Sequence, residues 1–310
     1  MKRLIVFCLV LALLPAIASA DSGYADYVMT RTLREQFESK SNTRLIDVPG
    51  RGEMIYYAQA NPFWTRFRYE TMGSKTFRRF GAGGCCPTST AIALANLLTP
   101  AELASIRPYA SKRAGGFGIT TASMNPLNAS INDGVYWFDH EQDYLDFLPL
   151  VVGQFAAGNN EKSYSWRVGS SSDGGSVGGT SAGFIQELAR CYGITLTKVA
   201  DKDDTSYLDM IRCGATAIAL ANTRWQPFST GVGHFVAVVA ADDEYLYIMD
   251  PQNKTKYDDC DRFDTLEVLE SGLVRARIEN YHNCQFSNVY VLTTPELDAR
   301  IALNGAVRAD

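Results

Sequence analysis

The C-terminal half of the chain alternates between short apolar runs and segments with helical spacing. Five runs rich in β-branched and aromatic residues predict strands, at 194–200, 215–221, 234–241, 245–250 and 286–294. The first two are each preceded by a segment with helical spacing that ends at a glycine, Gly193 or Gly214, as helices often do. Helices beside several neighbouring strands indicate an α+β fold.

The N-terminal half has fewer regular segments. Residues 87–98 are apolar on most sides, which predicts a buried helix. We also expect helices at 24–38 and 142–155 and an extended segment at 54–59. The stretch 105–180 is the least regular and ends in a run rich in glycine and serine, typical of a loop. No linker divides the chain, so residues 21–310 are expected to form a single domain.

Residues 1–20 have the pattern of a secretory signal peptide. Lys2 and Arg3 precede an apolar run, and small residues follow at Ala18-Ser19-Ala20, as a leader and its cleavage site require. The apolar run is too short for a membrane span. We therefore expect cleavage after Ala20, a secreted or periplasmic protein, and no membrane span.

Charge and cysteine content narrow the class of protein further. The formal net charge is −5, which argues against nucleic acid or an anionic membrane as the main partner. An oxidising compartment favours disulfides, and proximity along the chain suggests Cys191–Cys213 and Cys260–Cys284. This pairing leaves Cys85 and Cys86 unassigned.

The segment "GAGGCCPTST" at 81–90 places two cysteines before the buried helix. Pro87 fits the first helical turn, so both thiols would lie at a helix N-terminus, where the backbone dipole lowers a thiol pKa. A structural disulfide is the alternative. No second cysteine or histidine pair has the spacing of metal ligands, so neither a metal nor another cofactor is expected. If Pro87 is the first helical residue, Cys86 is the N-cap, and this spacing favours Cys86 as the nucleophile.

A thiolate nucleophile needs a base, and the chain has three histidines. His140 and His282 stand in polar segments and are expected at the surface. His234 opens an apolar strand, an unusual position for a polar ring without a partner. A short hairpin loop at 241–243 would place His234 opposite Asp250, which could then orient the imidazole. The alternative for Asp250 is a cap for the turn at Pro251.

Stabilising an oxyanion needs hydrogen-bond donors. Gln59 leaves the extended segment at 54–59 ahead of the cysteines in the chain, with Trp64 close behind. It is the candidate donor, against the alternative of an ordinary polar surface residue.

Taken in order, these motifs resemble the bacteriocin-processing-like cysteine peptidases of the papain-like superfamily. That family has the pattern Gln…G-C-G-P-T/S…H-F/Y…D-P. Here it is carried by Gln59, Gly84-Cys85-Cys86-Pro87-Thr88, Gly233-His234-Phe235 and Asp250-Pro251. The resemblance covers residues 54–251, with an unmatched middle at 108–179 that we expect to be an insertion beside the cleft.

The resemblance implies a papain-like fold, with a catalytic helix from the N-terminal part packed on a C-terminal antiparallel sheet. It implies a peptide or protein substrate, Cys85 as nucleophile, His234 as base, Asp250 as its orienter and Gln59 in the oxyanion hole. Cys86 departs from the family pattern, which has glycine there. It could be a bystander, the true nucleophile, or half of a vicinal disulfide that silences the site. A silent papain-like binding domain and a transglutaminase-type acyltransferase are therefore the alternative functions.

Overall fold

The computed structural model describes the chain in segments, which are residues 43–61, 64–65, 68–69, 78–105, 119–120, 145–157, 180–201, 204–221, 228, 233–254, 266–278 and 286–308. Several sequence expectations lie outside these residues: the signal peptide at 1–20, the helix at 24–38, His140, His282, the Cys260–Cys284 pair and most of 108–179.

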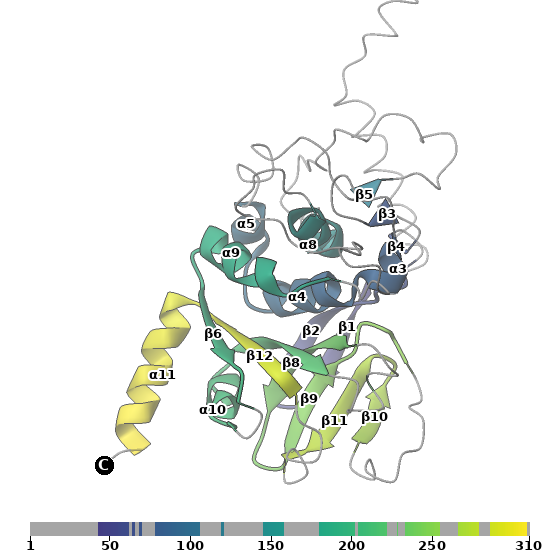
Figure 1. The fold of residues 1–310 in the computed structure, drawn as a ribbon. Helices are drawn as coiled ribbons and strands as arrows, with labels where there is room; N and C mark the ends of the chain where they lie inside the picture. Colours follow the sequence, from purple (N-terminus) through teal and green to yellow (C-terminus); the bar gives the residue numbers. More distant parts are fainter. Residues whose placement is uncertain are drawn as a thin grey trace, which may run out of the picture.

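An antiparallel sheet dominates the C-terminal half (Figure 1). It has seven strands in the order β10-β11-β9-β8-β7-β12-β6. All five strands expected from the sequence are present, as β6 (Thr195–Val199), β7 (Thr216–Ala221), β8 (His234–Ala241), β9 (Tyr245–Met249) and β12 (Phe286–Thr293). The sequence reading missed β10 (Leu266–Glu270) and β11 (Leu273–Arg277). These two strands form one edge of the sheet and carry several charged residues, so their apolar pattern is weak.

Helices pack against both faces of this sheet. Strand β8 shows the division, because Phe235, Ala237 and Val239 belong to one buried cluster whereas Val236 and Val238 belong to the other. Helix α4 (Cys85–Ala95) packs on β7 and β8 from the first side, and α10 (Tyr207–Arg212) packs on β8 from the second (Figure 1). The structure is thus α+β, as the sequence predicts.

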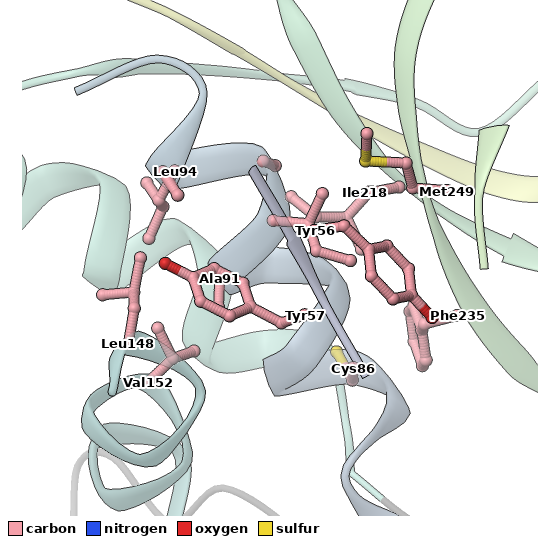
Figure 2. Close-up of a cluster of buried hydrophobic side chains, with 14 of the residues drawn as sticks. Tyr56, Tyr57, Cys86, Ala91, Leu94, Leu148, Val152, Ile218, Phe235 and Met249 are labelled. Carbon is pink, nitrogen blue, oxygen red and sulfur yellow. The ribbon is translucent and has the colours of Figure 1, made fainter. Parts of the chain in front are cut away.

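The helix α4 is buried along its whole length. Figure 2 shows Tyr57, Ala91, Leu148 and Val152 packed between α4 and α8 (Leu148–Ala157). Helix α8 lies within the segment 108–179 that we expected to be an insertion, yet it contributes to the main core. That part of the segment therefore supports the helix that carries the two cysteines.

The start of α4 differs from the sequence prediction. The helix begins at Cys85 rather than Pro87, and Gly84 is its N-cap. Pro87 is therefore the third helical residue, where its missing N–H costs nothing because the first four N–H groups of a helix lack intrahelical partners. Cys85, not Cys86, is thus the first residue of the helix. At Gly84 an added Cβ would lie 2.6 Å from the Phe80 carbonyl oxygen, so the close turn from α3 (Phe80–Gly83) requires glycine there.

The strands β1 (Thr43–Val48) and β2 (Gly52–Tyr57) form a hairpin, and β2 packs beside α4. The side chain of Asn96, the C-cap of α4, accepts a hydrogen bond from Ile55 N at 2.7 Å and donates one to Ile55 O at 2.8 Å. One amide therefore pairs with the strand as a neighbouring backbone would, and it holds the helix against β2.

The remaining elements are α5 (Pro100–Ala104), α9 (Gly183–Tyr192), α11 (Pro295–Arg308), and the short strands β3 (Arg68–Tyr69), β4 (Arg78–Arg79) and β5 (Ile119–Thr120). Helix α9 ends at Gly193 as expected, with a positive φ of 67°. Among the described helices, none is long and apolar enough to cross a membrane.

The predicted Cys191–Cys213 disulfide is wrong, because Cys213 is a free thiol. The two cysteines are close in sequence but pack against different buried clusters, on opposite faces of the sheet. Cys213 instead accepts a hydrogen bond from Asn304 Nδ2 at 3.4 Å.

Candidate active site

His234 and Asp250 form a buried pair at one end of the sheet. The His234 Nε2 atom lies 2.8 Å from Asp250 Oδ1, and the two residues are only 3% and 0% exposed. A buried carboxylate needs a charged or hydrogen-bonded partner, and the ring supplies it. The partnership expected from the sequence is therefore present.

The register that produces this pair differs from the one expected. Ala237 pairs with Met249, and a bulge interrupts the ladder between Val238 and Ala240. Continuing this register places Asp250 opposite Val236, so His234 lies two residues further along its strand and meets Asp250 diagonally. A shift of two residues keeps both side chains on the same face, whereas a shift of one would have separated them.

Asp250 is held by further hydrogen bonds from its surroundings. Its backbone N–H donates to Gly272 O at 2.8 Å, and its carbonyl oxygen accepts from the Tyr56 hydroxyl at 2.8 Å and from Asn253 N at 3.1 Å. Its Oδ1 also accepts from Gln252 N at 2.9 Å. The two alternatives for Asp250 are thus both realised, because one carboxylate caps the turn at Pro251 and holds the ring.

Cys85 meets the same ring from the N-terminus of α4. Its thiol is hydrogen-bonded to His234 and accepts from the backbone N–H groups of Cys86 and Phe235. Burial alone would raise the pKa of the Cys85 thiol, but the His234 hydrogen bond and charge, with the two N–H groups, outweigh it and lower the pKa below its usual value. This is the environment of a stabilised thiolate.

The His234 ring carries the matching positive charge. Burial alone would lower its pKa, but the Asp250 charge and hydrogen bond, followed by those of Cys85, raise the pKa of His234 to about 10. The two shifts oppose each other in direction, so the structure favours a Cys85 thiolate paired with a His234 imidazolium over two neutral groups. Because Nε2 is hydrogen-bonded to Asp250, Nδ1 is the ring nitrogen that contacts Cys85.

Cys86 lies in a different environment. It is fully buried within the apolar cluster that Figure 2 shows, near Tyr56 and Phe235. Burial, and then the charge of Cys85, raise the pKa of the Cys86 thiol well above its usual value, although its hydrogen bond with Thr90 acts in the other direction. Such a thiol stays protonated and unreactive, so the start of α4 brings Cys85, rather than Cys86, to the base.

Gln59 lies beside the turn that precedes Cys85. Its backbone N–H donates to Pro251 O at 2.6 Å, and its side-chain Nε2 donates to Gly81 O at 2.9 Å. The residue is 5% exposed, and its Oε1 has no hydrogen-bond partner within the described part of the chain. A carboxamide nitrogen carries two hydrogens, so one N–H of Gln59 remains for another acceptor. The alternative of an ordinary surface glutamine is wrong.

The structure adds three residues that the sequence reading missed, Tyr56, Gln252 and Gly272. Tyr56 binds the Asp250 carbonyl, and an added Cβ at Gly272 would lie 2.5 Å from the Tyr56 ring. Gln252 bonds Asp250 through its backbone, and its side-chain Nε2 lies 3.5 Å from His234 Nδ1. Of these three residues, only Gln252 could have been recognised from the sequence, because it directly follows Asp250-Pro251.

Among the described residues, no group of three or more histidine, cysteine or acidic side chains is arranged to hold a metal ion. No model of a protein family and no curated protein matched the chain.

Proposed function

We propose that this protein is a secreted cysteine peptidase of the papain-like type, which hydrolyses peptide or other amide bonds. The observation that carries the proposal is the buried hydrogen-bonded chain from the Cys85 thiol through His234 to Asp250. The opposed pKa shifts of Cys85 and His234 support it, because an ion-paired thiolate is the reactive form.

The chemistry follows from these groups. The Cys85 thiolate attacks the carbonyl carbon of the scissile amide, forming a C–S bond and an oxyanion. The oxyanion then collapses, the C–N bond breaks, and the leaving nitrogen takes the proton from His234 Nδ1. Water next attacks the resulting thioester, giving one proton to Nδ1, and the C–S bond breaks to regenerate the Cys85 thiolate.

Gln59 is proposed to bind the oxyanion together with the backbone N–H of Cys85. Its amide is held next to the α3–α4 turn by Gly81 O, while the second hydrogen of Nε2 remains to donate. Donors fixed in advance and aimed at the developing charge are a major source of rate enhancement in acyl transfer.

The resemblance to the bacteriocin-processing-like cysteine peptidases belongs to the same proposal. It is supported by the arrangement of the elements, because the helix that starts at Cys85 packs on the antiparallel sheet that carries His234 and Asp250. The leader-like pattern at 1–20 supports export from the cytoplasm.

The catalytically silent alternative predicts a Cys85–Cys86 disulfide in the isolated protein, and the two cysteines are free thiols in this structure. The transglutaminase-type alternative uses the same residues, and adding an amine nucleophile would separate it from hydrolysis by its products.

The proposal is tested by alkylation with iodoacetamide at pH 6, with the site of modification located by peptide mapping. Rapid labelling is expected at Cys85 in the wild-type protein and in Cys86→Ala, and its loss is expected in Cys85→Ala. Digestion of unfolded casein should show the same dependence on Cys85. Slow labelling that rises only near the pKa of a free thiol, about 8.5, would overturn the proposal.

A further inference from the structure

The side chain of Gln252 lies at the ring nitrogen of His234 that faces Cys85. Its Nε2 is 3.5 Å from His234 Nδ1, while its backbone N–H holds Asp250 Oδ1 at 2.9 Å. Gln252 is exposed, whereas His234 is 3% exposed. The glutamine therefore stands at the boundary between the buried ring and solvent, anchored by the same carboxylate that anchors the ring.

The proposed reaction makes Nδ1 the atom that hands a proton to the leaving group. Nε2 is occupied by Asp250 at 2.8 Å, so the leaving nitrogen must come within about 3 Å of Nδ1 to receive the proton. At that distance the leaving nitrogen and the first atoms behind it also lie within reach of the Gln252 carboxamide.

The ability of His234 Nδ1 to accept a hydrogen bond from the Gln252 amide changes during this proton transfer. While the ring is an imidazolium, Nδ1 carries a proton and cannot accept a hydrogen bond from an amide N–H. Once the proton has moved to the leaving nitrogen, Nδ1 has a lone pair and the Gln252 N–H can donate to it. An interaction that forms only as the proton leaves lowers the barrier to its departure.

From these contacts we infer that Gln252 is the leaving-group residue of this site: its carboxamide contacts the departing amine and stabilises the neutral ring that the proton transfer leaves behind. The inference rests on the proposed peptidase function. It assigns Gln252 to the substrate segment that follows the scissile bond, not to the acyl part that binds Cys85.

Two substrates with the same acyl part separate this role from a general loss of structure. A bond cleaved in unfolded casein supplies the acyl sequence, which is then synthesised as an extended peptide amide and as a p-nitrophenyl ester. The nitrophenolate leaves without a proton, so its departure does not need Nδ1. Gln252→Ala keeps the backbone N–H that binds Asp250, and Gln186→Ala, at an exposed position on α9, is the matched control.

We expect Gln252→Ala to lower kcat/KM for the peptide amide by about tenfold, as the loss of one hydrogen bond in a transition state does, and to leave the ester within about twofold. Gln186→Ala should change neither. An equal loss on both substrates, or no loss on the amide, would overturn the assignment while the peptidase function stands. Wild-type protein that cleaves no bond in unfolded casein would instead overturn the peptidase function, and the assignment with it.

Discussion

His234 and Asp250 are in contact at 2.8 Å although they do not face each other across the strand pair. The bulge between Val238 and Ala240 changes the register by one residue, and the ladder beyond it places Asp250 opposite Val236. His234 is two residues from Val236, so the His234 and Asp250 side chains stay on one face. The Asp250 carboxylate that holds the ring accepts a hydrogen bond from Gln252 N. The backbone carbonyl of Asp250 accepts one from the Tyr56 hydroxyl.

Replacing Asp250 by asparagine should weaken the thiolate. The Asp250 charge is the main favourable cause of the raised pKa of His234, so without it the ring loses its proton at a lower pH and no longer stabilises the Cys85 anion. We expect iodoacetamide labelling of Cys85 at pH 6 to slow by at least about tenfold, which is one pKa unit. Labelling at the wild-type rate would show that Asp250 acts only as a turn cap.

Tyr56 and Tyr57 offer a matched pair for separating the site from the core. Both are fully buried, but the Tyr56 hydroxyl donates to Asp250 O whereas the Tyr57 hydroxyl donates to Leu145 O, on the side of α8. Each change to phenylalanine should lower the free energy of unfolding by about 1 kcal/mol, from one lost hydrogen bond, as measured in urea.

Only Tyr56→Phe should also slow the labelling of Cys85, because only this hydroxyl holds the residue that orients His234. Equal labelling rates in the two variants would mean that the backbone contacts of Asp250, from Gly272 and Asn253, suffice to position it.

The free energy of unfolding should depend on pH in an unusual way. The folded pKa of His234 is raised to about 10, so this residue contributes stability that is complete below its unfolded pKa, about 6.5, and is lost as the pH rises toward 10. The folded pKa of Cys85 is lowered, so Cys85 contributes stability that is complete above its unfolded pKa, about 8.5, and is lost as the pH falls.

Between the folded and the unfolded pKa of Cys85 the two effects cancel, because the ion pair and the two neutral groups bind the same number of protons. Below about pH 8.5 wild-type stability should therefore fall less steeply with pH than that of Cys85→Ala, and above it both should decline. In Cys85→Ala the decline should begin near pH 6.5. Urea unfolding at half-unit pH steps measures both curves, and parallel curves would argue against the ion pair.

Gly84 and Gly233 stand directly before Cys85 and His234, which permits a second matched comparison. A Cβ at Gly84 would lie 2.6 Å from the Phe80 carbonyl oxygen, whereas a Cβ at Gly233 would lie 3.1 Å from a methyl group of Leu220, which can move. Gly84→Ala should lower the free energy of unfolding by about 1–3 kcal/mol, as overpacking does. Gly233→Ala should lower it by less. The reverse order in thermal or urea unfolding would contradict the tight α3–α4 turn.

Local patterns in the sequence were sufficient for the elements with strong periodicity. The five apolar strands and the helices ending at Gly193 and Gly214 are all confirmed. Their apolar periodicity and terminal glycines are local features, which can be recognised from a short stretch of sequence. The strands β10 and β11 escaped prediction because edge strands with charged side chains have little apolar pattern. The Cys191–Cys213 disulfide was wrongly inferred because closeness in sequence does not tell which face of a sheet a residue occupies.

The residues of the candidate site could be named from the sequence, but their arrangement could not. The residue types and their order single out the adjacent Cys85 and Cys86, with His234, Asp250 and Gln59, since few other residues combine the required chemistry with an unusual position. Tertiary structure alone decided which thiol meets the base, because the tight α3–α4 turn at Gly84 starts the helix two residues before Pro87. It also decided the register that joins His234 to Asp250 and brought Gln252 and Tyr56 to them, since these contacts depend on a bulge and on strands distant in sequence.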